Sequence, residues 1–219
     1  MTYLELVNAV LRRLRENEVT TVQGGIRQNT YARLIGDFIN ESKAQCEAAW
    51  DWSALRTTLT VTTTPDIFNY ILTGSNNKFE VLNVLNDSSD TVMKYQTSKW
   101  FDEQFLLTDP QKGSPYYYSF NGVDAVGDTQ VDVWPIPDSV EELRFNVVLR
   151  PVSLVADTDK LIIPSRPVIL LATAMAIEER GEDGAQQSVN AYATGQSALS
   201  DEIALDAARH PEELIWHQV

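Results

Sequence analysis

Residues 31–52, YARLIGDFINESKAQCEAAWDW, decide the fold. Their apolar side chains recur at the i, i+3, i+4, i+7 spacing that is typical of one buried face of an α-helix. These side chains are Tyr31, Leu34, Ile35, Phe38, Ile39, Cys46 and Ala49. At a rise of about 1.5 Å per residue the pattern predicts a helix roughly 33 Å long. Trp50 and Trp52 stand where the pattern ends, and we expect them to close the helical layer.

The chain has 219 residues, of which 43% are hydrophobic, enough for one large domain or two small ones with a proper core. It contains no run of about 20 apolar residues, and its N-terminus is charged and periodic. We therefore expect a soluble chain that is intracellular when made and does not enter a membrane.

The net charge is −14, from 17 basic and 31 acidic residues spread along the chain. An acidic surface repels a phosphate backbone. Two interpretations remain open, an ordinary acidic soluble protein and a surface past which DNA must move without sticking.

Cysteine and histidine give no sign of a reactive or metal site. Cys46 is the only cysteine, so it forms no intramolecular disulfide, and its position on the apolar side of the long helix favours a small buried residue. His210 and His217 flank Glu212 and Glu213 in a terminal tail, which does not hold metal ligands in fixed geometry.

Helical signals occur at both ends of the chain. Thr2 and Glu5 have the spacing of a capping box before a helix over about 3–16, and Asn29 or Thr30 is suited to cap the long helix. Ser165 is a cap candidate for an apolar helix that continues to Gly181. A last helix over about 185–208, paired antiparallel with it, has one side made of Val189, Tyr192, Ala193, Gln196, Leu199 and Ile203.

Between the helices the period changes to 2, which indicates strands. Expected strands begin near 55 and cover 67–72, 79–85, 92–95, 116–120, 130–134 and 143–149, with one short helix within 97–107 and a turn at Asn121-Gly122. Their connections are too short for crossover helices, so the strands should be mostly antiparallel. The spacing indicates a small β-sandwich or a barrel-like sheet.

The predicted fold class is therefore α+β, with a discontinuous helical bundle. Residues 1–54 and 160–219 form the bundle, and residues 55–159 form an inserted β-domain. The alternative is a single α+β domain in which helices cover a sheet.

Catalytic signatures are weak, so we assign no catalytic, cofactor-binding or metal-binding residue and predict a non-enzyme. Ser197 follows Gly195 as in a nucleophile elbow, but the second glycine is missing and the pattern around it is helical. Asp124, Asp128 and Asp132 lie near aromatic residues, as in some sugar-cleaving sites, although the first two flank turn glycines. The cluster of Arg12, Arg13 and Arg15 is best interpreted as a solvated helix face.

The tail HPEELIWHQV, residues 210–219, has Leu214, Ile215 and Trp216 where a chain end is normally polar. Such a group is a natural anchor for a pocket of another molecule. We interpret these residues as an anchor in the pocket of a neighbouring molecule, and folding back onto the chain's own bundle is the alternative.

The order of these features resembles the head-to-tail adaptor (connector) proteins of tailed bacteriophages, of the tail tubular protein A type. The resemblance rests on residues 4–16, AAWDWSALR (48–56), TLTVTTTPDIFNYIL (58–72), GSPYYYSF (113–120), VDVWPIPD (131–138), LRFNVVLRPVSL (143–154) and residues 161–184. Residues 96–112 and the C-terminal tail depart from it.

The resemblance implies a structural virion protein without a cofactor. Such adaptors form a homo-oligomeric ring, typically dodecameric, that joins the portal protein to the tail or nozzle protein. Genomic DNA passes through the ring without sequence-specific binding, and the protein resides in the phage neck or tail after assembly in the host cytoplasm. Leu214, Ile215 and Trp216 would then bind the portal or a neighbouring subunit. From their position between the long helix and the first strand, we expect Trp50 and Trp52 to pack between the two domains. The alternatives are an acidic DNA mimic or regulatory binding protein and a β-domain carbohydrate hydrolase.

Overall fold

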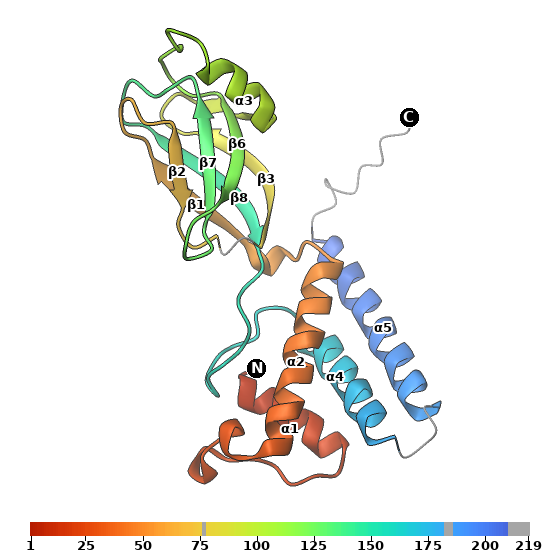
Figure 1. Cartoon of the computed structure of the whole chain (residues 1–219). Coiled ribbons are helices and arrows are strands. Elements are labelled where there is room, and N and C mark those ends of the chain that lie inside the picture. The colour runs from red at the N-terminus through yellow and green to blue at the C-terminus, as the bar shows by residue number, and fades with distance from the viewer. Residues whose placement is uncertain (76–77, 182–185, 210–219) are drawn as a thin grey trace. The chain divides into compact units, whose positions relative to one another are not determined.

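The computed structural model describes residues 1–75, 78–181 and 186–209. It has the predicted α+β class, with helices at both ends of the chain and strands between them (Figure 1). The chain folds into two compact units, one of Met1–Ala54 with Ser153–Val219 and one of Leu55–Val152. We describe each unit by itself and call them the helical unit and the β-unit. The predicted domain boundaries stay a prediction.

Helix α1 covers Tyr3–Arg13 and begins with the predicted capping box. The Thr2 backbone N–H donates to Glu5 Oε2 at 2.8 Å, and the Glu5 N–H donates to Thr2 Oγ1 at 3.3 Å. The helix ends before the predicted residue 16, because Leu14 is its C-cap and Arg15 takes a left-handed φ of 59°.

Helix α2 covers Thr30–Ala49, and Asn29 caps it by accepting the Ala32 N–H at 3.0 Å. The predicted end at Trp52 is wrong, since Trp50 is the C-cap in an extended conformation. The Trp52 indole Nε1 instead donates to the Cys46 carbonyl at 2.8 Å. It thereby satisfies one of the carbonyls that the last turn of any helix leaves without an intrahelical partner.

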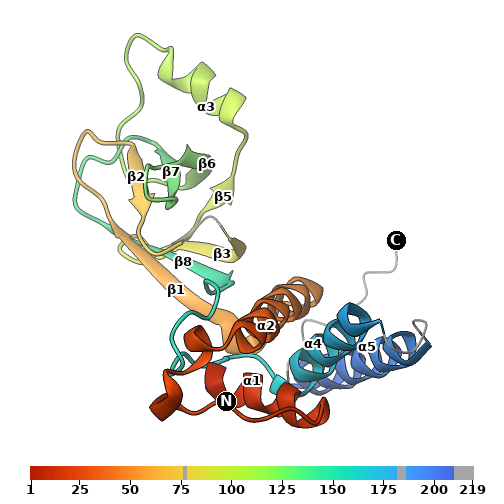
Figure 2. The ribbon, with the colours of Figure 1, turned by 60° about the horizontal axis from the view of Figure 1, so that its bottom comes forward.

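Helices α4 (Ser165–Arg180) and α5 (Gln186–Ala207) lie side by side in both views (Figure 1, Figure 2). Arg166, near the start of α4, reaches Asp201, near the end of α5, at 4.0 Å, as expected for an antiparallel pair. Ser165 is not the cap of α4, because Pro164 occupies that position without a side-chain hydrogen bond. Gly181 ends the helix with a left-handed φ of 65°.

The buried face of α5 differs from the predicted one. Its buried residues are Ser188, Gly195, Ala198, Leu199 and Asp206, whereas Val189 is 60% exposed and Tyr192 42% exposed. A Cβ at Gly195 would come within 2.7 Å of Leu171 Cδ2 on α4. Close approach of α4 therefore requires small residues on the inner face. Of the predicted side, Leu199 is buried there, whereas Val189, Tyr192 and Ala193 are exposed.

The β-unit consists of two four-stranded sheets. One has the order β1 (Arg56–Thr62), β8 (Glu142–Leu149), β3 (Phe79–Asn86) and β4 (Thr91–Val92). The other has the order β2 (Asn69–Leu72), β7 (Thr129–Trp134), β6 (Tyr117–Val123) and β5 (Lys94–Tyr95). All strand pairs are antiparallel except β5 with β6, which confirms the prediction of a mostly antiparallel arrangement.

Side chains of both sheets form one core in the β-unit, as in a sandwich. Phe145 on β8 is fully buried and meets the ring of Tyr118 on β6 with centroids 5.9 Å apart. The short helix α3 (Ser98–Phe105) follows its Thr97 cap and packs through aromatic rings. The centroid of Trp100 lies 5.1 Å from that of Tyr117, and Phe105 lies 5.6 Å from Trp134.

The predicted turn at Asn121-Gly122 is wrong, because both residues belong to β6. The β6–β7 register shifts between Phe120 and Val123, and Gly122 supplies a positive φ of 79° at this irregularity. The actual turn follows Asp124, whose Oδ1 accepts the N–H groups of Val126, Gly127 and Asp128 at 2.8, 2.8 and 2.9 Å.

The contact between α1 and α2 gives a first prediction. A Cβ added to Gly36 of α2 would collide with the hydroxyl of buried Tyr3. Glycine to alanine inside a helix normally stabilises by about 1 kcal/mol. We expect Gly36→Ala to destabilise the helical unit instead, by about 1–3 kcal/mol, because of overpacking.

The measurement is urea unfolding followed by helical circular dichroism. In a Tyr3→Phe background the clashing oxygen is gone, so Gly36→Ala should cost measurably less than it does beside Tyr3. An equal cost in both backgrounds would show that the collision does not govern the effect.

Candidate interaction surfaces

The predicted anchor residues Leu214, Ile215 and Trp216 lie outside the described residues, as do His210 and His217. Their role stays a prediction. The site is therefore built from the described part of the helical unit, to which the tail is attached.

Asp206 fixes the end of α5 to the chain segment that follows α2. One carboxylate oxygen accepts the Trp50 indole N–H at 3.0 Å and the Ser53 backbone N–H at 2.9 Å, and the other accepts the Ser53 hydroxyl at 2.5 Å. Burial by itself raises the pKa of Asp206, but the bonds from Ser53 and Trp50 and the charge of Arg209 outweigh it. The pKa therefore lies below its ordinary value.

Trp50 and Trp52 thus both hold the end of α2 within the helical unit. Trp52 is only 1% exposed, while Trp50 is partly exposed. Their packing between two domains stays a prediction.

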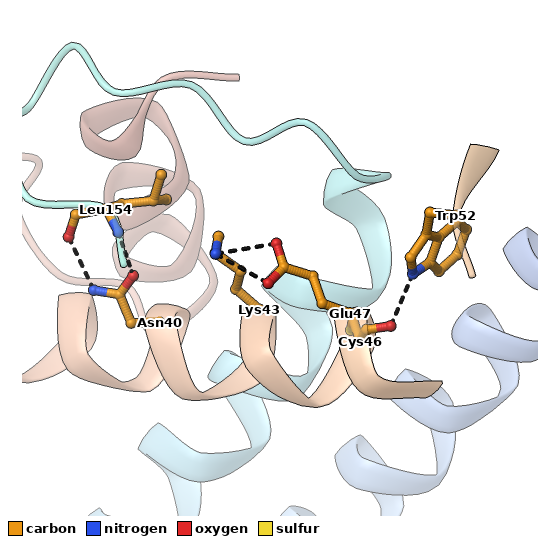
Figure 3. A network of polar contacts seen from close by, with 6 residues as sticks. All are labelled: Asn40, Lys43, Cys46, Glu47, Trp52 and Leu154. Atoms are coloured by element: carbon orange, nitrogen blue, oxygen red, sulfur yellow. Dashed lines mark hydrogen bonds and ion pairs between the residues drawn. The ribbon is translucent and has the colours of Figure 1, made fainter. Parts of the chain in front are cut away.

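A buried ion pair lies along α2 (Figure 3). Lys43 and Glu47 are each 3% exposed, and the ammonium nitrogen lies 3.0 and 3.1 Å from the two carboxylate oxygens. Removal of a single ion from water costs several kcal/mol, and pairing with an opposite charge offsets part of this desolvation cost. Cys46 lies between Lys43 and Glu47 in the sequence. Burial raises the pKa of its thiol to about 12, and the charge of Glu47 adds to this effect. This pKa agrees with a structural cysteine.

The chain re-enters the helical unit through residues 153–164, which we call the return segment. Asn40 of α2 holds it at Leu154 with two hydrogen bonds, Nδ2 to the carbonyl at 3.0 Å and the Leu154 N–H to Oδ1 at 2.8 Å (Figure 3). Farther along, the carbonyls of Asp159 and Asp157 accept the N–H groups of Tyr3 and Leu4 at 2.7 and 3.2 Å. The return segment therefore caps α1 and is fastened to α2.

A groove of about 410 Å³ lies between α2, the return segment and the 3-10 helix η2 (Ile26–Gln28). We call it the α2 groove. Its lining contains Tyr3, Ile26, Leu154 and Val155 as well as the charged residues Arg27, Arg33 and Asp37. Burial and the charges of Asp37 and Asp157 raise the pKa of the Tyr3 hydroxyl to about 12. The groove therefore combines apolar surface with two arginines.

The exposed side of α5 over residues 186–200, which we call the outer face, is uncharged, whereas Asp201 nearer the end of the helix is an exposed acid. Residues 186–200 contain no acidic or basic residue, although the chain carries a charge of −14. Val189 and Tyr192 lie on this face, and the Tyr192 hydroxyl accepts a hydrogen bond from Gln45 of α2 at 2.9 Å. Ser197 is an exposed residue of this helix, which confirms the predicted helical pattern around it.

The three aspartates weighed for sugar hydrolysis each have a structural partner in the β-unit. Asp124 holds its own turn, and the N–H groups of Asp128, Val126 and Gly127 lower its pKa. The Gly74 N–H donates to Asp128 at 3.1 Å, and Asn69 donates to Asp132 at 2.6 Å. Burial raises the pKa of Asp132, and the bonds from Asn69 and Asn121 offset part of this effect.

The described residues contain no group of three metal-ligating side chains suited to hold an ion. None of the helices in the described ranges has the length and apolar character needed to cross a membrane.

Comparison with protein families matches residues 1–213 to the family described as SU10 adaptor protein. The chain belongs to this family. It is a bacteriophage adaptor family, so the chain is a structural head-tail adaptor, in agreement with the predicted absence of an enzymatic role. No curated protein matches the chain. The finer likeness to tail tubular protein A stays a prediction.

Sequence reasoning missed Asp206, the Lys43–Glu47 pair and the α2 groove. One signal for the pair was present: Lys43 follows Ile39 by four residues and therefore falls on the apolar stripe of α2. No local signal could reveal the groove, since its lining comes from four separate parts of the chain.

The buried pair gives a second prediction. Lys43→Met or Glu47→Gln alone should cost about 3–5 kcal/mol, because each leaves an uncompensated buried group. The double variant Lys43→Met/Glu47→Leu should recover most of this loss. Urea unfolding of all three measures it, with Arg12→Ala as control, because the exposed Arg12–Glu18 pair at 3.5 Å should contribute at most about 1 kcal/mol. A double variant as unstable as the singles would contradict the pairing.

The third prediction concerns Trp52. Trp52→Ala should cost on the order of 3 kcal/mol, since it empties a buried site and removes the bond to the Cys46 carbonyl. Trp52→Phe keeps most of the volume and should cost clearly less. Thermal and urea unfolding measure both, and a change near zero for alanine would be inconsistent with a buried indole.

Proposed function

We propose that this chain forms a homo-oligomeric, dodecameric adaptor ring that joins the portal protein to the tail or nozzle protein in the phage neck. The observation that carries the proposal is the match to the SU10 adaptor family over residues 1–213. Assembly would take place in the host cytoplasm, before the ring becomes part of the virion.

The charge distribution supports self-association through the outer face of α5. Two copies that each carry a charge of −14 repel each other, so they meet most favourably through a face without charges. Residues 186–200 provide such a face, with Val189 and Tyr192 exposed on it. The face suits a second copy of the chain better than it suits a strongly basic partner.

We propose further that genomic DNA passes through the centre of the ring without sequence-specific binding. An acidic chain does not attract the phosphate backbone, and DNA can therefore slide past it. The same acidity supports the alternative function of a DNA mimic or regulatory binding protein, which would bind a basic partner instead of a portal.

The two compact units support a further proposal, that the helical bundle and the β-region are separate domains with Trp50 and Trp52 at their boundary. Residues 153–159 pack with the helical unit, so we propose the second boundary at 152/153 in place of 159/160. In Trp52→Ala, calorimetry would then show the two units unfolding more independently.

For the tail we propose that Leu214, Ile215 and Trp216 bind the portal or a neighbouring subunit. A tryptophan beside two aliphatic residues is the kind of group that anchors an interface.

The fourth prediction tests assembly by size exclusion coupled to light scattering, for the chain alone and with its portal. We expect a monomer alone and a ring on the portal. Deletion of residues 211–219 should leave the monomer folded and weaken the ring.

Tyr192→Asp should weaken the ring as well, because it places a charge on the uncharged face of α5. Ser89→Asp, at an exposed turn of the β-unit, is the matched control with no expected effect. A persistent monomer with the portal would contradict the adaptor ring, and a complex with a basic non-portal partner would favour the DNA mimic.

A further inference from the structure

We infer that the α2 groove is the docking site for residues 212–216 of a neighbouring copy of this chain. The inference rests on the proposed ring, since it requires copies of the chain side by side. It names a binding partner for the α2 groove, to which the family match assigns no partner.

The groove offers the chemistry that this segment needs. Arg27 and Arg33 line it, and among the described residues neither guanidinium makes an ion pair or a hydrogen bond. Ile26 and Leu154 line its apolar part, and Val155 is exposed beside them. Its volume of about 410 Å³ falls within the range of sites that bind small ligands or side chains.

The sequence of the tail has the complementary pattern. Glu212 and Glu213 directly precede Leu214, Ile215 and Trp216. Two carboxylates can pair with two guanidiniums, preferably in bidentate geometry, while the following apolar side chains cover the apolar lining. Asp37 lines the groove one turn after Arg33, and the charge of Asp157 also acts on Tyr3, so both carboxylates reduce the positive charge of the groove. The arginine that is free of such a helical neighbour, Arg27, should therefore contribute most to binding the glutamates.

Chain length indicates that the occupant comes from a neighbour. Asp206 holds the end of α5 beside Trp50, at the end of α2, while Arg33 lies about 25 Å away along the axis of α2. The chain from Arg209 to Glu213 spans at most about 14 Å when fully extended. The backbone of the tail therefore ends about 11 Å short of Arg33 of the same copy, a gap that only fully extended side chains on a straight path along α2 would close.

The direction of approach adds to this distance. α5 contacts α2 through Gln45, whereas Arg33, Asp37 and Asn40 lie about a third of a turn around the helix, at about 100° per residue. A chain that starts at α5 would also have to pass around α2, whose diameter is about 10 Å. The tail of a second copy is limited neither by this distance nor by this direction of approach.

The fifth prediction uses a fluorescent peptide of residues 208–219, titrated into the chain that lacks residues 211–219. We expect saturable binding, weakened at least tenfold by Arg27→Glu/Arg33→Glu in the chain or by Glu212→Lys/Glu213→Lys in the peptide. The charge-reversed peptide should again bind the charge-reversed chain. Arg12→Glu/Arg13→Glu is the matched control, because it reverses two arginines outside the groove and should leave binding unchanged.

Two outcomes would overturn the inference. One is a titration in which the peptide does not bind, or in which neither charge reversal weakens binding. The same holds if the reversed peptide does not bind the reversed chain. The other is that the dilute full-length monomer does not bind the peptide while the truncated chain does. This result would assign the groove to the chain's own tail. The titration contains no portal, so a failure here is distinct from a failure of ring assembly on the portal.

Discussion

The helical unit depends on the hydrogen bonds that the return segment makes with α1 and α2. Two parts of the chain that are about a hundred residues apart must meet to build one bundle. Asn40 fixes Leu154 at both its backbone groups, and the carbonyls of Asp157 and Asp159 satisfy the first N–H groups of α1. Without these bonds the start of α1 would keep backbone donors without protein partners, and α4 would have no fixed starting point. The α2 groove exists because the same contact places Val155 opposite Arg33 and Asp37.

Polar groups also fix the other end of α2. Trp52 donates to the Cys46 carbonyl, and Asp206 gathers Trp50 and Ser53 at the end of α5. Between these ends lies the buried Lys43–Glu47 pair. Such interactions add little net stability compared with apolar packing. The Lys43–Glu47 pair and the Trp52 bond are local to α2, whereas the Asp206 bonds form only when the end of α5 lies beside the end of α2. We regard this constraint on the position of α5 as the main contribution of the Asp206 bonds.

Periodicity predicted most of the fold, because the α-helix and the half-buried strand each impose a spacing on apolar residues. The Thr2–Glu5 box and the Asn29 cap were predictable for the same reason, since capping depends on residues a few positions apart. The errors arose where long-range packing decides. Small residues at Gly195 and Ala198 face α4 because space is short there, and hydrophobic Val189 and Tyr192 are left outside. Gly122 marks a strand irregularity and not a turn, because Asp124 forms the turn with its own side chain. The groove was not predictable, since Ile26, Arg33 and Val155 meet only after the chain has returned.

The pairing of β1 with β8 has a consequence for how the protein is made. Arg56 lies opposite Val148, so the entrance and the exit of the β-unit are neighbours in the folded strands. On the ribosome, α1 and α2 are synthesised first but lack the return segment for roughly 5–20 s, at a rate of about 5–20 residues per second. If the β-unit folds during that interval, it converts a flexible loop of about a hundred residues into a short connection and lowers the entropy cost of closing the bundle. The inserted β-unit would then act as an intramolecular assembly aid, which joins the two halves of the helical unit in the order in which they leave the ribosome.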